Sequence, residues 1–133
     1  MNKLFIFFYI IVFSFSNIWA MENPFLKKYN TEFQIPPFSK IDESDFMPAF
    51  KMGIEAHNRE IDSIIKNSED PSFENVIIEL ERSGSLLDRV GAVFFNLSGS
   101  TSNEAIQNIE KDISPILSQH YDSISLNPKI FKK

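Results

Sequence analysis

Apolar residues recur at steps of three and four along three successive stretches of the sequence. Such spacing places them on one face of an α-helix, which repeats every 3.6 residues. No stretch alternates apolar and polar residues as a half-buried strand would. The sequence therefore predicts an all-α fold of about three antiparallel amphipathic helices. Their inward residues are Phe46, Phe50, Ile54, His57, Ile61, Ile64 and Ile65 in the first, Phe73, Ile77, Leu80, Gly84, Leu87, Gly91 and Phe94 in the second, and Ile106, Ile109, Ile113, Ile116, Leu117, His120 and Ile124 in the third.

Prolines and small polar residues predict where the first two helices begin and end. Pro48 is expected in the first turn of the first helix, where a backbone N–H has no intrahelical partner to lose. The Asn-Ser-Glu-Asp-Pro segment at 67–71 should stop that helix, and Ser72 can cap the second. The second helix should run unbroken to 98–100, where Ser-Gly-Ser ends it. A second ridge beside its main stripe consists of Val76, Ser83, Val90 and Leu97.

Two glycines lie seven residues apart on the expected inner face of the second helix. Gly84 and Gly91 each cost roughly 1 kcal/mol of helix propensity relative to alanine. Their placement predicts that the backbone of a neighbouring helix approaches closely at both positions.

The third helix carries both a start signal and an internal proline. The Thr-Ser-Asn-Glu sequence at 101–104 matches a capping box, in which Thr101 and Glu104 satisfy end donors reciprocally. Pro115 falls in the middle and should kink the helix. Residues 125–133 are expected to form a turn and the beginning of another element.

The first twenty residues have the order of a secretory signal peptide. Lys3 supplies a positive charge, residues 4–13 form an unbroken apolar run, and Ala20 offers a small residue for cleavage. The run is ten residues long, whereas a membrane span needs roughly 20. Cleavage after Ala20 predicts an exported protein, periplasmic or secreted, with no stable membrane insertion afterwards; an uncleaved anchor is the alternative.

Residues 21–41 are expected to form an extended N-terminal arm. Pro24, Pro36 and Pro37 fix φ and remove backbone donors, which disfavours a helix there. The chain is thereby divided into a signal peptide at 1–20, this arm at 21–41 and a helical segment at 42–133.

Composition and charge exclude several classes of function. The chain has no cysteine, which excludes a disulfide scaffold and a thiol nucleophile. The net charge of −5 gives no basic surface for nucleic acid, so no nucleic-acid partner is expected.

No catalytic constellation is visible in the spacing of polar residues. His57 and His120 lack the H-E-x-x-H pattern, and a zinc site needs at least three protein ligands, so each is interpreted as a packed histidine. The many serines form neither a G-x-S-x-G elbow nor a triad. The acidic residues of the second helix are interpreted as a surface group, with Glu79 beside Arg82 and with Glu81 and Asp88 toward solvent. We therefore assign no catalytic, cofactor-binding or metal-binding residue in this chain.

The order of residues carries more information than their spacing. The sequence resembles the zinc oligopeptidase family in several segments. These lie at 71–90, 93–97 and 124–131, together with His120, and upstream at 23–25, 36–38 and 46–50. That family includes oligopeptidase A, thimet oligopeptidase and peptidyl-dipeptidase (dipeptidyl carboxypeptidase). Within this family, the predicted signal peptide and the sequence Ser-Gly-Ser-Leu-Leu-Asp-Arg at 83–89 favour peptidyl-dipeptidase.

The resemblance implies the leading helices of a much larger, mostly helical zinc metallopeptidase. Peptidyl-dipeptidases release dipeptides from the carboxyl end of oligopeptides, with zinc held by an H-E-x-x-H helix and a downstream Glu. None of those residues has a counterpart in this sequence, so zinc and oligopeptide substrate are expected only in a full-length enzyme. The resemblance therefore predicts an inactive N-terminal portion, whose partner is the remainder of the enzyme or another chain.

An alternative comes from a different functional class. The same helices would suit a stand-alone secreted interaction module that binds a peptide or a partner subunit.

Overall fold

The computed structural model describes residues 23–101 and 103–133. The chain divides into two compact units, one ending at Ile41 and the other spanning Asp42–Lys133. The signal peptide that the sequence predicts at 1–20 lies outside the described residues.

Residues 23–41 form no α-helix, in agreement with the proline-rich arm that the sequence predicts. Three short 3₁₀ turns interrupt the extended backbone, at Pro24–Leu26 (η1), Glu32–Gln34 (η2) and Phe38–Lys40 (η3). Asn23 begins the first turn, where its side-chain Oδ1 accepts a hydrogen bond from the Phe25 backbone N–H at 3.0 Å.

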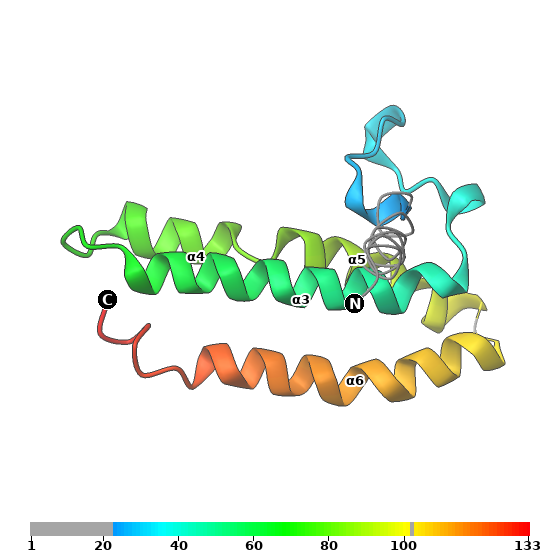
Figure 1. Ribbon diagram of the computed structural model, residues 1–133. Helices are drawn as coiled ribbons and strands as arrows, with labels where there is room; N and C mark the ends of the chain where they lie inside the picture. The colour runs from blue at the N-terminus through cyan, green and yellow to red at the C-terminus, as the bar shows by residue number, and fades with distance from the viewer. Residues whose placement is uncertain (1–22, 102) are drawn as a thin grey trace, which may run out of the picture. The chain divides into compact units, whose positions relative to one another are not determined.

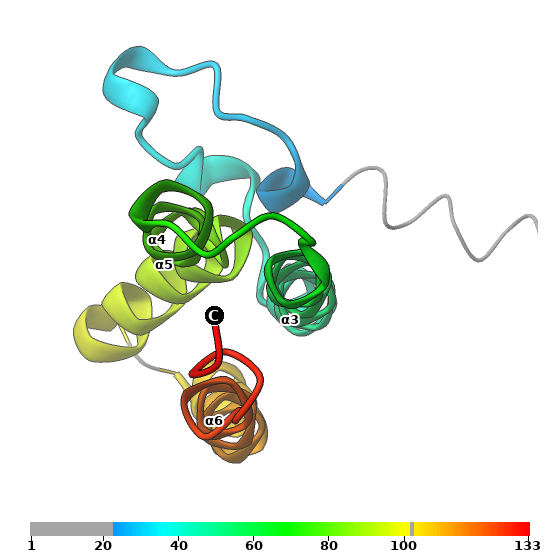
Figure 2. The same cartoon turned by 90° about the vertical axis from the view of Figure 1, so that its left-hand side faces the viewer.

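The second unit is all-α within its described residues, as predicted. Its elements are α3 (Glu43–Lys66), a π-helical turn η4 (Phe73–Ile78), α4 (Glu79–Arg82), α5 (Ser85–Thr101) and α6 (Glu104–Ser125). Figures 1 and 2 show three helical rods, formed by α3, by η4–α4–α5 in succession, and by α6. Helix α3 packs against both α5 and α6.

The three rods run up, down and up. The side chain of Asn103, at the start of α6, donates to Glu43 Oε1 at the start of α3, at 2.9 Å. At the opposite end, Lys133 Nζ donates to the backbone oxygen of Asn67. The first and third rods are therefore parallel to each other, and the second runs antiparallel to both (Figure 1).

An aromatic cluster forms the core between α3 and α5. Phe94 of α5 lies edge-on to Phe46 and Phe50 of α3, with ring centroids 5.0 and 5.3 Å apart. All three side chains are buried. Pairs in this geometry contribute about 0.5–1.5 kcal/mol beyond their buried area.

A second apolar cluster lies nearer the other end of α3. Ile61 and Ile64 pack with Val76 of η4, and partly buried residues from other elements extend the cluster. These are Ile65, Leu80, Ile124 and Ile130.

Helix α3 begins earlier than predicted, and the expected place of Pro48 is wrong. Asp42 is the N-cap, and its backbone N–H donates to Asp45 Oδ2 at 2.9 Å. This acidic cap extends the helix toward the N-terminus, so Pro48 falls in the second turn. The ring of Pro48 is exposed, and the missing N–H costs one intrahelical bond.

The predicted continuous second helix is interrupted. A break at Ser83–Gly84 separates α4 from α5, and Gly84 has a φ of 77°, in the left-handed region. The expected approach of a neighbouring helix backbone is not found at this glycine: a Cβ there would lie 2.9 Å from the side-chain ring of His57. The expectation is also wrong at Gly91, where a Cβ would meet only the Phe95 side chain of the same helix, at 3.9 Å.

The π turn changes which residues of the second rod face inward. Its hydrogen bonds span one residue more than those of an α-helix, so the helix surface rotates relative to an α-helical pattern. Phe73 and Ile77, expected inward, are 63% and 44% exposed, whereas Val76 of the second ridge is 7% exposed. Of the predicted stripe, Leu80 is partly buried against the second apolar cluster, and Leu87 and Phe94 beyond the break are buried.

The junction between α5 and α6 also differs from the prediction. Thr101 is the last residue of α5 and does not cap α6, so the helix passes through the expected stop at 98–100. Asn103 is the N-cap, and its Oδ1 accepts from the Ile106 backbone N–H at 2.9 Å. Asparagine is as effective as serine as an N-cap. The match of Thr-Ser-Asn-Glu at 101–104 to a capping box led to the prediction of Thr101 as the cap instead.

Helix α6 is continuous through Pro115 and buries most of its predicted face. Ile106, Ile113, Leu117 and His120 are buried, whereas Ile116 is 41% exposed. After α6 the chain makes successive turns to Lys133, and no further helix begins there. Across 23–101 and 103–133, no helix combines the length and apolar character needed to cross a membrane.

Candidate functional site

A polar cleft of about 910 Å³ lies between the C-terminal half of α3 and the η4–α4 segment. Its lining is polar or charged except for one isoleucine. The lining residues are Glu60, Ser63, Ile64, Lys66, Asn67, Ser68, Glu74, Asn75, Glu79, Arg82 and Ser83.

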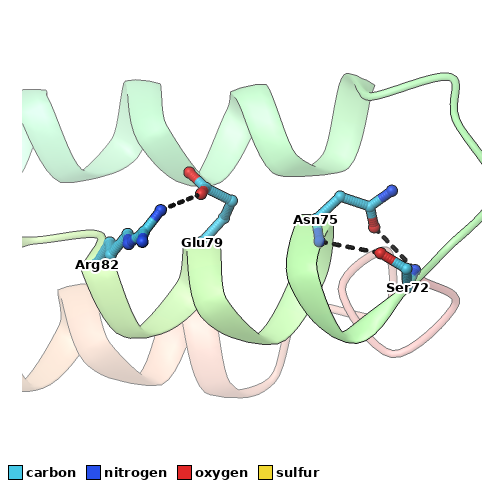
Figure 3. A network of polar contacts seen from close by, with 4 residues as sticks. All are labelled: Ser72, Asn75, Glu79 and Arg82. Carbon is cyan, nitrogen blue, oxygen red and sulfur yellow. Dashed lines mark hydrogen bonds and ion pairs between the residues drawn. The ribbon is translucent and has the colours of Figure 1, made fainter.

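The η4–α4 wall of the cleft is held in shape by local polar contacts (Figure 3). Ser72 Oγ accepts from the Asn75 backbone N–H at 3.1 Å, and the Ser72 N–H donates to Asn75 Oδ1 at 2.8 Å. This reciprocal cap confirms Ser72 as the start of the second rod. One turn further on, Arg82 Nη1 lies 3.2 Å from Glu79 Oε1, the pair that the sequence predicts.

The cleft adjoins the break between α4 and α5, because Ser83 at the end of α4 lines it. The Gly84 backbone N–H donates to Glu60 Oε2 of α3 at 2.7 Å. Ser83 Oγ lies 3.2 Å from His57 Nε2, also of α3. Two side chains one helical turn apart on α3 therefore hold the backbone at this junction.

His57 is in turn joined to His120 of α6. His120 Nε2 lies 3.0 Å from His57 Nδ1, and the two side chains are 6% and 8% exposed. The interpretation of both as packed histidines is confirmed, but their spacing in the sequence does not indicate that they pair. The structure brings them into one buried relay with Ser83, which we call the histidine relay.

The proton positions in the histidine relay follow from Ser83. Its hydroxyl donates to the Leu80 backbone oxygen at 2.7 Å, so Ser83 Oγ accepts from His57 Nε2–H. His57 Nδ1 is then the unprotonated nitrogen and accepts from His120 Nε2–H. Each hydrogen bond is donated in the same direction: from His120 of α6 to His57 of α3, and from His57 to Ser83 at the end of α4.

This direction is unsuited to nucleophilic catalysis by Ser83. A general base must accept the serine proton, whereas His57 Nε2 donates to Ser83 Oγ. Ser83 is 9% exposed, and the neighbouring Gly84 N–H, a potential oxyanion donor, is bound to Glu60. The arrangement joins three elements of the fold and does not form a serine triad.

Burial sets the protonation of the relay. Desolvation lowers the pKa of His57, although the carboxylates of Glu60 and Asp88 act in the opposite direction. Desolvation also lowers the pKa of His120, and the nearby His57 lowers it further. Burial raises the pKa of the adjoining Tyr121 phenol, as do the charge of Asp88 and their hydrogen bond. Both imidazoles therefore stay neutral to a lower pH than a free histidine does.

The relay does not fit a zinc site. Two of the imidazole nitrogens face each other at hydrogen-bonding distance and do not converge on a common point. Among the described residues, no group of three or more His, Asp or Glu side chains is placed to hold a metal ion. A zinc site needs at least that number of protein ligands.

The acidic residues of the second rod are only partly as predicted. Glu81 and Asp88 are exposed, as expected, and the Glu79–Arg82 pair is a surface pair. Asp88, however, also contacts Tyr121 of α6, which the sequence spacing did not indicate.

Comparison with known proteins supports the resemblance seen in the sequence. No protein-family model matches the chain. The chain is 34% identical over 111 residues to the dipeptidyl carboxypeptidase of Escherichia coli (strain K12), and 32% identical over 111 residues to that of Salmonella typhimurium. Each match covers 84% of this chain and 16% of the relative. The predicted relationship is therefore confirmed: the chain is related to the peptidyl-dipeptidases, over 16% of their length.

Proposed function

We propose that this chain supplies a helical N-terminal wall segment of an exported zinc metallopeptidase of the peptidyl-dipeptidase type, and that it has no peptidase activity alone. The observation that carries the proposal is the identity of 34% with a dipeptidyl carboxypeptidase, sustained over 84% of the chain. Relatedness at that level over most of the chain supports a shared structural role for the segment.

In this proposal, the substrate and the metal belong to the complete enzyme. An oligopeptide would be bound and zinc would be held by parts of the enzyme that this chain does not share. The histidine relay supports the proposal because its hydrogen bonds serve the packing of three elements and not a metal or a nucleophile.

A chimera of the Escherichia coli relative tests the proposed role. Residues 23–133 of this chain replace the aligned segment of that enzyme, and release of C-terminal dipeptides from a short peptide is measured. The chimera should release dipeptides, and a chelator should abolish the activity. A Phe94→Asp chimera, which puts a charge into the aromatic core, is the matched control and should lose activity through misfolding. A chimera that folds cooperatively yet releases no dipeptide would contradict the proposal.

The isolated 133-residue chain tests the inactivity. It should bind no stoichiometric zinc after metal loading and dialysis, and it should not release dipeptides. One tightly bound zinc per chain, together with chelator-sensitive dipeptide release, would overturn this part of the proposal.

Export is tested at the N-terminus. We propose that the signal peptide is cleaved after Ala20, which leaves Met21 as the first residue. Intact mass and N-terminal sequencing of protein recovered from the periplasm of a bacterial host would show this end. Recovery in the cytoplasm with Met1 in place would contradict export.

A stand-alone interaction module is the second candidate function. Large apolar side chains that are well exposed in this unit favour it: Phe73 is 63%, Leu126 77% and Phe131 78% exposed. Under this alternative, the chain should unfold cooperatively by itself and bind a peptide or partner with a defined stoichiometry. Aggregation of the isolated chain, relieved only within the chimera, would favour the peptidase segment.

A further inference from the structure

We propose that the histidine relay is an acid-operated latch, which holds the α4–α5 junction against α3 and releases it when the two imidazoles together take up a second proton. This inference concerns the fold of the segment and does not depend on the proposed function.

The latch acts on a junction that a second polar contact also ties to α3. His57 reaches Ser83, and Glu60 reaches the Gly84 N–H, so both contacts fall on adjacent residues of the break. The His57 ring also packs directly over Gly84, where no Cβ would fit. Gly84 has the positive φ of a hinge glycine and stands between two separate helices.

The first proton can be taken up without breaking the relay. In the neutral pair, His120 Nε2–H donates to His57 Nδ1, and His120 Nδ1 carries no hydrogen. A proton added at His120 Nδ1 leaves Nε2–H in place, so the bond to His57 persists and becomes charge-assisted. The singly protonated relay is therefore still closed.

The second proton has nowhere to go without breaking the bond. It must bind His57 Nδ1, and that nitrogen then becomes a donor facing the donor of His120 at a separation of 3.0 Å. Two cationic rings also repel each other across this distance, because both residues are buried and the solvent screens their charges little. The rings must separate, and because Nδ1 and Nε2 belong to one rigid imidazole, a turn of the His57 ring away from His120 also moves Nε2 away from Ser83 Oγ.

The groups around the pair decide the pH at which release occurs. Glu60 of α3 and Asp88 of α5 bring negative charge toward His57, which favours its protonation. The neutral groups in contact are Tyr121 of α6, whose phenol stays protonated, and Ser83. Burial outweighs the carboxylates and lowers the pKa of both histidines, so release lies on the acid side of the ordinary histidine range.

Release changes the shape of the polar cleft. Ser83 lines the cleft and ends its α4 wall, while Glu60 lines the opposite wall. When His57 withdraws, η4–α4 can turn about Gly84 relative to α3, and the cleft widens. The aromatic cluster between α3 and α5, formed by the Phe46, Phe50 and Phe94 rings, does not titrate and should keep its packing.

The absence of cysteine makes the movement measurable by spin labelling of the full chain. One pair of labels, at Glu55→Cys in α3 and Glu81→Cys in α4, reports the latch. A second pair, at Lys51→Cys and Ala92→Cys, reports the α3–α5 packing and serves as the control; all four native side chains are exposed. Between about pH 7.5 and about pH 5, across the histidine range, the first distance should lengthen by several ångströms and the second should stay constant.

Two variants keep the relay's shape and remove its second charge. In His57→Gln, the amide can still donate to Ser83 but takes up no proton. In His120→Gln, the amide can turn its oxygen toward a protonated His57 and keep the bond. Acid lengthening of the α3–α4 distance should be lost in both variants.

Nitrogen NMR of the unlabelled wild-type chain reports the protons directly, even if one variant fails to fold. The neutral tautomers should be Nε2–H for both rings, and the opening should follow the second protonation and not the first. An α3–α4 distance that stays constant while both rings ionise would overturn the proposal. So would an acid response that persists in folded His57→Gln.

Discussion

Gly53 of α3 faces the backbone of Leu87 in α5 so closely that a Cβ on Gly53 would lie 3.0 Å from the Leu87 Cα. Both residues are buried, and the Leu87 Cβ and Cδ1 would each lie 3.2 Å from the added Cβ, so α3 and α5 meet closely here. This is the close helix approach that the sequence suggested for Gly84 and Gly91, and it involves a glycine on the other helix.

The first prediction concerns this contact. Gly53→Ala should destabilise the chain by about 1–3 kcal/mol, because α3 and α5 must move apart to admit the methyl group. This loss outweighs the gain of about 1 kcal/mol in helix propensity. Urea denaturation of the full chain, followed by circular dichroism, measures the difference. Gly99→Ala is the matched control, since it adds a methyl group in α5 with nothing within 4 Å, and it should be stabilising. Equal effects of the two substitutions would show that α3 and α5 are farther apart at Gly53 than a 3.0 Å approach to the Leu87 Cα implies.

The second prediction separates two glycines that the sequence could not distinguish. Gly84→Ala should be destabilising by about 1–2 kcal/mol from the left-handed backbone alone, with a further loss from the His57 ring 2.9 Å away. Gly91→Ala should raise stability by up to about 1 kcal/mol, since it lies inside α5 and its new Cβ makes only ordinary contact. Thermal unfolding of the two variants side by side measures the difference. A destabilised Gly91→Ala variant would restore the original expectation of a close approach there.

The third prediction concerns the start of α6. Asn103→Ala should cost about 1 kcal/mol, because the Ile106 N–H loses its side-chain acceptor and Glu43 loses its hydrogen-bond donor. Thr101→Ala should be close to neutral or slightly stabilising, since Thr101 ends α5 and caps nothing. The free energies of unfolding of these two variants decide between the two caps. A larger loss at Thr101 would favour the capping box that the sequence pattern predicts.

The helical period predicts the elements of the second unit well, because three amphipathic rods need only local spacing. It does not predict the π turn or the break at Gly84, which depend on tertiary contacts. Gly84 can take a positive φ because it has no Cβ, and Glu60 of α3 holds its N–H there. Nothing in the sequence near Gly84 indicates the contact with Glu60. The shift in register at η4 then reverses the expected burial of Phe73 and Val76.

The histidine relay could have been inferred from helix register. His57 lies 14 residues beyond Glu43, and His120 lies 16 beyond Glu104, the first residues of α3 and α6. In an up-down-up bundle, the first and third helices are parallel, so both histidines stand at nearly the same level on inward faces. Searching for metal or nucleophile patterns within one helix does not test such a pairing across two helices. Helix register does not predict the contact between Ser83 and His57, because this contact depends on the break in the second rod.

The fourth prediction concerns the aromatic core. Phe94→Ala should cost about 3–5 kcal/mol, since the ring is fully buried and contacts both Phe46 and Phe50 edge-on. The neighbouring Phe95→Ala should cost clearly less, because Phe95 is 43% exposed. Urea denaturation gives the free energy of unfolding of both variants. If Phe94→Ala shows no cooperative transition, its loss of stability lies at the upper end of that range. A larger effect at Phe95 would mean that the second rod is rotated relative to the arrangement described here.

The fifth prediction is that stability falls as the pH drops below the ordinary histidine range. Burial lowers the pKa of His57 and His120 in the folded chain, so the unfolded chain binds more protons below about pH 6.5. The stabilisation is complete above that pH and is lost progressively as the pH falls toward the folded-state pKa values, by about 1.4 kcal/mol per pH unit for each excess proton. Asp62 acts in a different window: its pKa is lowered by the hydrogen bond from Lys66, so its contribution is lost only in the more acidic carboxyl range. Urea midpoints at about pH 7.5, 6 and 5 measure the histidine effect. The double variant His57→Gln and His120→Gln should have a much flatter profile, and an equally steep profile in that variant would assign the pH dependence to other groups.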